Sequence, residues 1–221
     1  WAKKNELPTL EGHRRGSENF EHLIDKAKEM GIKYFTGWAF STENWKRAKE
    51  ENEYLFNLAR NFTKRYKRKF LKEKIRFIHL GRKDRLPKDV VDILLDLEKQ
   101  TKEYTDFTVC LAMDYGGHDD LIRAVTKLVV LGEKVSEENI TKHLDTGTLI
   151  PHPDFIIRTS GEMRLSGFMS WQSAYAELYF PKEYFPDFGP EELVTAIGEY
   201  TKRDRRFGGN SAKSKGDYTN K

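Results

Sequence analysis

Two long segments carry apolar residues at the spacing of an amphipathic helix. In residues 13–30, the side chains that recur with a period near 3.6 are Phe20, Leu23, Ile24 and Ala27. Gly31 follows as a helix stop signal. Residues 49–74 carry a longer apolar stripe, formed by Leu55, Leu58, Phe62, Tyr66 and Phe70. The pattern therefore predicts helices over residues 13–30 and 49–74.

Short runs of β-branched and aromatic residues predict strands at 33–40, 75–80, 107–114, 155–157 and 178–180. Further helical patterns lie at 88–104, 118–131, 136–144, 167–176 and 190–203. Strands that alternate with helices indicate an α/β fold with a mainly parallel central sheet flanked by helices. We predict a single domain over residues 1–209 and a basic polar tail over 210–221. In such sheets, ligands bind beyond the carboxyl ends of the strands.

The lengths of the apolar runs and the cysteine count indicate the cellular compartment in which the protein is expected. The longest apolar run, residues 107–113, contains a threonine and is far shorter than the ~18 residues of a membrane span. The N-terminal residues have no apolar signal-peptide core, and Cys110, the single cysteine of the 221 residues, has no cysteine partner in the chain. We therefore expect a cytoplasmic protein.

Positive charge is concentrated in two segments of a chain whose net charge is +4. Residues 60–76 carry nine Lys or Arg against one Glu, and residues 202–221 carry seven against two acidic residues. The remainder of the chain is therefore acidic. The basic segments are suited to phosphate, nucleic acid or an anionic lipid surface, although a solvated helix face explains them equally well.

Polar loops follow two of the predicted strands. After the first strand come Ser41, Thr42, Glu43, Asn44, Trp45, Lys46 and Arg47. Helix capping explains the hydroxyls and the glutamate but not a tryptophan beside an arginine.

The second loop, residues 158–166, contains Arg158, Arg164, Ser166 and further hydroxyl and glycine residues. Guanidinium forks and backbone amides of this kind form a diphosphate cradle. The alternative is a surface loop whose arginines pair with Glu162 or Glu177. The Walker A and GxGxxG spacings are both missing.

Two further segments have weaker signals. His13, Arg14 and Arg15 open the first long helix, where an anion can bind. Gly116 and Gly117 follow the third strand, where a tight turn is the simpler explanation. The sequence has no Cys/His zinc spacing, EF-hand or HExxH motif.

Taken together, these segments resemble the cis-prenyltransferases, and specifically the bacterial undecaprenyl diphosphate synthases. The matching stretches run in family order over nearly the whole chain: WAKK (1–4), GHR (12–14), AFSTENWKR (39–47), DYGG (114–117), IRTSGEMRLS (157–166), WQ (171–172), AYAELYF (174–180), PDF (186–188) and RRFGG (205–209). The FSTENW and RTSGEMRLS signatures are highly specific.

The resemblance implies repeated condensation of isopentenyl diphosphate onto an allylic diphosphate such as farnesyl diphosphate, with each new double bond cis. The product is a long-chain polyprenyl diphosphate, a lipid-carrier precursor for cell wall synthesis. The enzyme class implied is a Mg²⁺-dependent cis-prenyltransferase.

The family's site residues carry over as expectations. Arg158, Arg164, Leu165 and Ser166 would hold isopentenyl diphosphate. Trp1 and His13 would form part of the allylic diphosphate site, with Arg47 and the turn of Ser41, Thr42 and Glu43 close by. Asn44, with Ser41 beside it, would assist proton removal, and Trp45 would shape the allylic site. Glu177 would be a Mg²⁺ ligand.

The resemblance also implies partners. Family members pair as homodimers, and we expect the contact within residues 177–206. The stripe on residues 49–74, with Val91, Leu94 and Leu95, would line a tunnel for the lipid, although core packing explains the same stripe. The cations of residues 60–76 would then face an anionic membrane peripherally.

Three features depart from the family pattern. The family's Asp-Gly-Asn-Gly-Arg motif, with its magnesium-binding aspartate, precedes the residue matched by Trp1. We therefore expect a natural protein that is longer at its N-terminus, where this motif and a first strand lie, and no turnover from a molecule that begins at Trp1. Thr9 and His118 stand where relatives have arginine. At the first of these positions, we expect Lys3, Lys4 or Arg14 to bind the allylic diphosphate in place of the arginine.

Two other functions remain open. A nucleic-acid-binding module is suggested by Phe62, Tyr66 and Phe70 among the cations, but these aromatics fall on the apolar stripe, so we expect no nucleic acid. A non-catalytic partner subunit of a cis-prenyltransferase is the other alternative. It is opposed by the presence of Asn44 and the arginines, and supported by the missing aspartate.

Overall fold

A computed structural model describes residues 1–205. Three strands form its main sheet: β1 (Tyr34–Ser41), β3 (Phe107–Tyr115) and β2 (Ile75–Leu80), in the order β1-β3-β2. Both pairings are parallel. Every residue of the central strand β3 is buried, as expected for a parallel strand covered on both faces. These pairings confirm the predicted α/β class with a parallel sheet.

A second, smaller sheet pairs β4 (Phe155–Ile157) with β5 (Glu177–Tyr179), again in parallel. β4 and β1 are not hydrogen-bonded neighbours, so the predicted central sheet is present as two separate groups of strands. The additional strand that the family resemblance implies before Trp1 stays a prediction.

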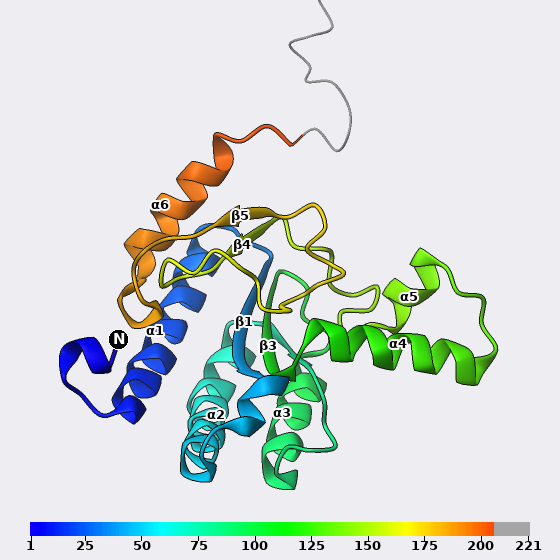
Figure 1. The fold of residues 1–221 in the computed structure, drawn as a ribbon, viewed down its shortest axis with the longest axis horizontal. Coiled ribbons are helices and arrows are strands. Elements are labelled where there is room, and N and C mark those ends of the chain that lie inside the picture. The colour runs from blue at the N-terminus through cyan, green and yellow to red at the C-terminus, as the bar shows by residue number, and fades with distance from the viewer. Residues whose placement is uncertain (206–221) are drawn as a thin grey trace, which may run out of the picture.

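Helices cover the sheet unequally. α1 (Thr9–Glu29), α2 (Lys49–Lys72) and α3 (Lys88–Thr101) pack with the main core on one face. On the other face, Ile150 and Met169 from irregular segments pack on β2 and β3. α6 (Pro190–Thr201) lies beside α1, while α4 (Gly117–Leu131) and α5 (Glu137–His143) project to one side (Figure 1).

The first helix begins four residues earlier than predicted. Its N-terminal flank is Pro8, whose carbonyl accepts the N–H of Glu11 at 2.9 Å, and Thr9 is its first residue. His13 therefore lies inside the helix rather than among the free amides of its first turn. The prediction that His13 and its neighbouring arginines open the helix was wrong.

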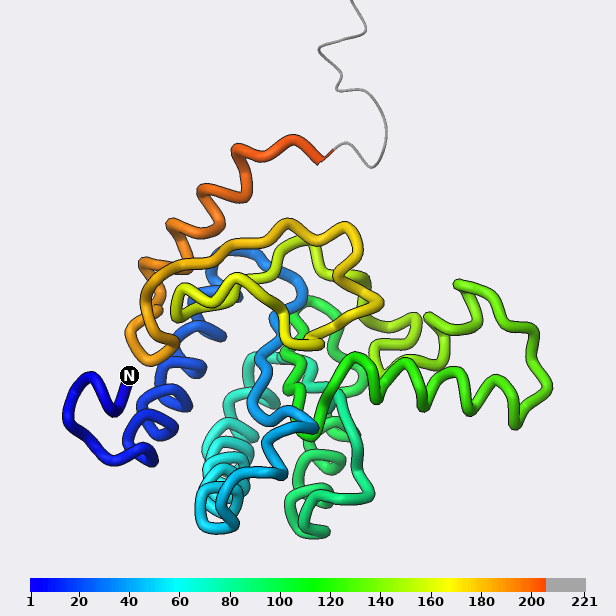
Figure 2. The backbone as a smooth tube through the Cα atoms, in the orientation of Figure 1, coloured from blue at the N-terminus to red at the C-terminus, as the bar shows by residue number. Residues whose placement is uncertain are grey.

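The helix predicted over residues 167–176 is absent. Residues 166–175 form consecutive turns, and Ser166, Gly167 and Met169 have φ angles of 50°, 83° and 47°. Left-handed residues interrupt the helical hydrogen-bond pattern. Two side chains of this segment, Met169 and Gln172, are buried. Figure 2 shows the resulting irregular path of the backbone between β4 and β5.

The remaining elements agree with the sequence-based prediction to within a few residues. The predicted basic tail, 210–221, and the last four residues of the predicted domain lie outside the described residues.

Phe70 is a suitable test of the core, because it has no exposed surface and packs on Phe62, Tyr66 and Phe77. We expect Phe70→Ala to lower the free energy of unfolding by about 3 to 5 kcal/mol, measured by urea denaturation. Arg68→Ala, an exposed change on the same helix, should alter it by at most ~0.5 kcal/mol. Similar values for the two variants would show that the α2 stripe is not core.

Candidate active site

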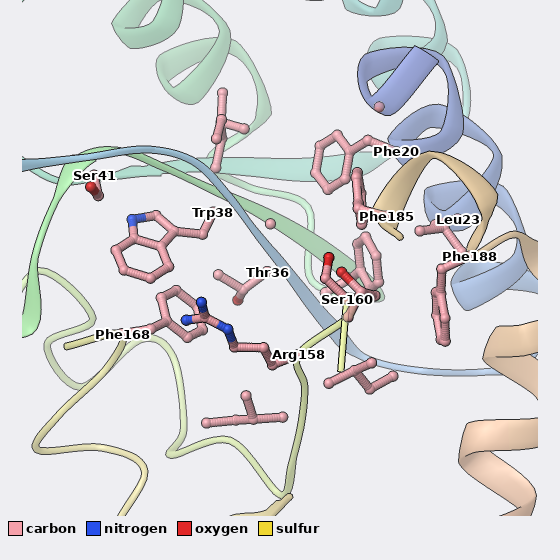
Figure 3. Close-up of a pocket in the computed structure, with 18 of the residues that line it drawn as sticks. Phe20, Leu23, Thr36, Trp38, Ser41, Arg158, Ser160, Phe168, Phe185 and Phe188 are labelled. Atoms are coloured by element: carbon pink, nitrogen blue, oxygen red, sulfur yellow. The ribbon is translucent and has the colours of Figure 1, made fainter. Parts of the chain in front are cut away.

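A cavity of about 1490 Å³ lies between β1, β4, α1 and α2. Its lining is largely apolar and includes Phe20, Leu23, Leu55, Leu58 and Phe62. Figure 3 shows Ser41 and Arg158, with Trp38 and Phe168 beside them, on one side of this cavity and Phe20, Leu23, Phe185 and Phe188 on the other. We call the side with Ser41 and Arg158 the polar end and the opposite side the apolar end.

The polar end is built at the carboxyl ends of two strands. Ser41 ends β1, and Asn44 and Arg47 lie in and just after the short 3₁₀ helix that follows (Thr42–Lys46). Arg158 follows β4 directly, and Leu165 and Ser166 are further along the same loop. All of these residues line the cavity, together with Trp1 and His13. The fold thus brings the residues after β1 and β4 to the same cavity as Trp1 and His13, the two residues predicted to bind the allylic diphosphate.

Arg158 and Ser166 are in direct contact. The Arg158 guanidinium Nη1 donates to the Ser166 hydroxyl at 3.0 Å. Arg164 does not line the cavity; its side chain is 64% exposed and pairs with Glu162. The alternative of a self-paired surface loop therefore describes Arg164 but not Arg158.

The backbone part of the predicted cradle is wrong at two positions. The N–H of Ser160 donates to the carbonyl of Glu183 at 2.6 Å, and the N–H of Gly161 donates to the carbonyl of Pro181 at 2.8 Å. These amides hold the loop to the segment after β5, so an anion would have to displace a carbonyl to reach them. The cationic and hydroxyl side chains remain the groups suited to bind phosphate.

Glu51 joins two predicted site residues and was missed by the sequence analysis. Its Oε1 is 3.0 Å from His13 Nε2 and accepts a hydrogen bond from Arg47 Nη1 at 3.0 Å. The Arg47–Glu51 spacing of four residues is a signal for a helical ion pair. The contact with His13 is visible only in the tertiary structure, because α1 and α2 are distant in sequence.

The turn after β1 is held by its own side chains. The Ser41 N–H donates to Asn44 Oδ1 at 3.0 Å, and Thr42 Oγ1 donates to Glu43 Oε1 at 3.0 Å. Burial alone would raise the pKa of Glu43, but hydrogen bonds from its own backbone N–H, Ser41 and Thr42 outweigh burial and lower this pKa. Thr42, Glu43 and Trp45 do not line the cavity.

Thr42 packs against Gly116, where a Cβ atom would meet its hydroxyl oxygen at 2.4 Å. This close approach explains a glycine at that position.

The proposed substitutes for an arginine at position 9 differ in placement. Lys3 and Thr9 line the cavity, whereas Arg14 is held by Glu11 and Glu18. Trp1 also lines it, and its indole Nε1 donates to Asp187 at 2.7 Å.

The described residues do not complete a magnesium site. Glu177 accepts a hydrogen bond from Arg203 Nη1 at 2.8 Å and does not line the cavity. Within residues 1–205, no group of three or more His, Cys, Asp or Glu side chains is placed to hold a metal ion. A single carboxylate already paired with arginine is a poor donor set for Mg²⁺, which prefers several oxygen ligands.

The basic stretch on α2 is partly neutralised by neighbouring helices. Four cations form ion pairs with carboxylates of α1 or α3: Arg60 with Asp89, Arg65 with Glu21, Lys67 with Asp96 and Lys69 with Asp25. Phe62 and Phe70 are buried, so they are not available to stack on bases. Among the described residues, no helix combines the length and apolar character needed to cross a bilayer.

A buried polar network around Asp120 joins α4 to residues 145 and 172. Asp120 has no exposed surface; its carboxylate accepts the N–H of Asp145 at 2.9 Å and lies 3.4 Å from the amide nitrogen of Gln172. Burial, followed by the charge of Asp145, raises the pKa of Asp120 to about 6. The sequence analysis assigned no role to this residue.

The cavity thus combines an apolar lining with cationic and hydroxyl side chains. A family model described as "Putative undecaprenyl diphosphate synthase" matches residues 1–208. The chain therefore belongs to the undecaprenyl diphosphate synthase family of cis-prenyltransferases, which elongate prenyl chains.

Individual relatives and solved structures are similarly informative. The chain is 45% identical to an isoprenyl transferase of Thermotoga maritima and 44% identical to one of Aquifex pyrophilus; the matches cover 95% and 94% of this chain and 91% and 90% of the relatives. Lavandulyl diphosphate synthase from Lavandula x intermedia, solved in complex with dimethylallyl diphosphate, superposes with a TM-score of 0.89 at 34% identity, over 94% of this chain and 92% of that chain. A probable undecaprenyl diphosphate synthase from Campylobacter jejuni gives 0.79 at 34% identity, over 88% and 92%.

The raised pKa of Asp120 predicts a pH-dependent stability difference. Because the folded state binds this proton more tightly than the unfolded chain, the group lowers the free energy of unfolding as pH rises from 3.8 to about 6. We expect the stability of Asp120→Asn relative to wild type to increase across that range, measured by urea denaturation at pH 4, 5, 6 and 7.

Asp119→Asn is the matched control. Burial would raise the pKa of Asp119, but Arg123 and Arg82 outweigh it and lower this pKa, so its relative stability should be flat between pH 4 and 6. A flat profile for Asp120→Asn as well would contradict the raised pKa.

Proposed function

We propose that this protein condenses isopentenyl diphosphate onto an allylic diphosphate, such as farnesyl diphosphate, in successive cis additions that yield a long-chain polyprenyl diphosphate. The observation that carries the proposal is the pairing of Arg158 with a neutral hydroxyl, Ser166, at the polar end of the cavity. Other arginines near the site are matched by carboxylates, such as Arg47 by Glu51. The charge of Arg158 is therefore suited to meet an anionic substrate.

The two diphosphates would occupy opposite sides of the polar end. Arg158 and Ser166, supported by Leu165, would bind isopentenyl diphosphate, and Arg164 would reach it after leaving Glu162. His13, Trp1 and Arg47 would bind the allylic diphosphate beside the Ser41 turn. Ionisation of the allylic substrate builds negative charge on the leaving diphosphate, and pre-oriented donors stabilise that charge most in the transition state.

Asn44 would orient the path of the departing proton. An amide is too weak a base to remove a proton unaided, and Asn44 Oδ1 already accepts the N–H of Ser41. The hydrogen bond holds the side chain at the cavity wall. The proton would pass to a diphosphate oxygen or a carboxylate that the amide aligns.

The apolar end would hold the growing chain. Its lining includes Phe20, Leu23, Phe185 and Phe188, whose apolar side chains suit an isoprenoid chain. The predicted tunnel lining applies only to the first half of the α2 stripe, since Leu55, Leu58 and Phe62 line the cavity. Phe70 and Leu94 belong to the core, and Leu95 is exposed.

Magnesium dependence remains part of the proposal as an expectation from the family. If the ion binds, it would neutralise charge on the leaving diphosphate. Glu177 is the described residue that the resemblance assigns as a Mg²⁺ ligand. The ion pair between Glu177 and Arg203 would have to break before Glu177 could bind the ion.

Separate effects of two substitutions test the assignment of roles. In assays of the full-length protein with isopentenyl and farnesyl diphosphates and Mg²⁺, Arg158→Ala should raise the KM for isopentenyl diphosphate about 10-fold or more. Asn44→Ala should mainly lower kcat, with little change in either KM. Product lengths and double-bond stereochemistry are read by chromatography, and EDTA should abolish turnover.

If Arg158→Ala mainly lowers kcat and Asn44→Ala mainly raises the KM for isopentenyl diphosphate, the roles assigned to the two residues would be exchanged. Binding of isopentenyl diphosphate without any turnover would favour the non-catalytic partner subunit. Retention of an added oligonucleotide at moderate salt would favour the nucleic-acid alternative.

We also propose a homodimer, and the structure suggests a different contact from the predicted residues 177–206. The most exposed apolar side chains of α4 are Ile122, Val129, Val130 and Leu131, at 66%, 69%, 78% and 55%. α4 projects from the body of the molecule (Figure 1). Ile122, Val129 and Val130 lie within about 100° of one another around the helix axis. An isologous contact would place two copies of the side that carries them against each other.

Two matched substitutions decide between the contacts. If α4 forms the dimer, Val130→Glu should give monomers in light-scattering measurements, while Val194→Glu, on α6 within residues 177–206, should remain dimeric. The reverse result would favour the contact within residues 177–206. A wild-type protein that is monomeric in solution would contradict both proposed contacts.

A further inference from the structure

Asp114 is a buried carboxylate directly behind the turn that carries Asn44. It lies in β3, one residue before its carboxyl end, and has no exposed surface. Its φ angle is 52°, in the left-handed region that few residues other than glycine adopt, although Asp and Asn tolerate it best. The neighbouring loop fits this backbone closely, because the Arg82 N–H donates to the Asp114 carbonyl at 3.0 Å. Strain of this kind often accompanies a functional constraint.

Both carboxylate oxygens of Asp114 are used, and by two different segments. Oδ1 accepts the indole N–H of Trp45 at 2.8 Å and a further bond from Arg85 Nη2, while Oδ2 accepts Arg85 Nε at 2.9 Å. The bidentate guanidinium compensates the buried charge. The carboxylate therefore links the loop after β2 to the turn after β1.

The indole of Trp45 is held on its other sides as well. The Arg85 guanidinium lies 5.8 Å from the centre of the ring, and Phe40 and Phe56 pack against it with centroid distances of 5.4 Å and 5.5 Å. Trp45 does not line the cavity. Its position in the structure is that of an anchor beneath the turn.

Asn44 directly precedes this anchor and does line the cavity. The turn is thus fixed at two points, by the hydrogen bond from Ser41 to Asn44 and by the bond from Trp45 to Asp114. Release of the second point would let Asn44 move relative to the substrates. Displacements near 1 Å at a catalytic group can cost about 100-fold in rate.

We propose that Asp114, charge-paired by Arg85, is a positioning residue that holds Trp45 and thereby orients Asn44 for the chemical step. The proposal rests on the proposed prenyl transfer for its catalytic consequence. The placement of Trp45 is independent of that function.

The test substitution is Asp114→Asn in the full-length protein. Asparagine keeps the size of the side chain and tolerates the left-handed backbone, but its NH₂ group cannot accept from Arg85. We expect kcat to fall about 10- to 100-fold, with the KM values for both diphosphates changed less than 3-fold. The indole N–H resonance of Trp45, assigned by its loss in Trp45→Phe, should shift in a ¹H–¹⁵N spectrum.

Glu21→Gln is the matched control. Glu21 is also a buried carboxylate, and it is held by an arginine and an aromatic side chain, Arg65 and Tyr66. It lines no part of the cavity. Its substitution should reduce stability without changing kcat per folded molecule or the Trp45 resonance.

Three outcomes overturn the proposal: an unshifted Trp45 resonance in Asp114→Asn, an unchanged kcat, or an equal fall in kcat for Glu21→Gln. A wild-type protein that turns over neither substrate defeats the proposed function instead. In that case the resonance comparison still decides whether Asp114 positions Trp45.

Discussion

Parallel pairing on both sides of β3 is the constraint on which the rest of this structure depends. The pairing aligns the carboxyl ends of β1, β2 and β3 at one edge, and the register places Ser41 opposite Tyr115. Segments that follow different strands therefore meet there, although they are dozens of residues apart. Because β3 is buried along its whole length, a charged side chain near its end, such as Asp114, needs an oppositely charged partner inside the protein.

Local charge compensation is the second organising feature. Glu51 lies between His13 and Arg47, Asp114 is held by Arg85, and the Asp120 network includes Arg123. Glu51 joins α2 to α1, and Arg85 joins the loop after β2 to the end of β3. At the buried Asp114, removal of Arg85 would leave a charge that is costly to bury. Arg158 has a hydroxyl as its partner, so no carboxylate offsets its charge and the guanidinium is suited to bind an anion.

The incorrect predictions have a common physical origin. The composition of residues 167–176 predicts a helix, but the left-handed φ angles at 166, 167 and 169 interrupt it, and the segment forms turns. The loop at 158–166, with three hydroxyl residues and one glycine, has the composition of an anion nest, but carbonyls after β5 accept two of its amides. In both cases, contacts from distant segments determined how a locally ambiguous sequence was used.

The sequence by itself determined the α/β class, the order of the elements and the motifs at the ends of β1 and β4, because periodicity and local composition carry that information. The tertiary structure alone showed that Glu51 joins His13 to Arg47, that Trp45 lies beneath the turn on Asp114, and that the strands form two separate groups. Such contacts depend on which distant segments pack together when the chain folds. Spacing along the chain does not encode that choice in a form that can be read locally.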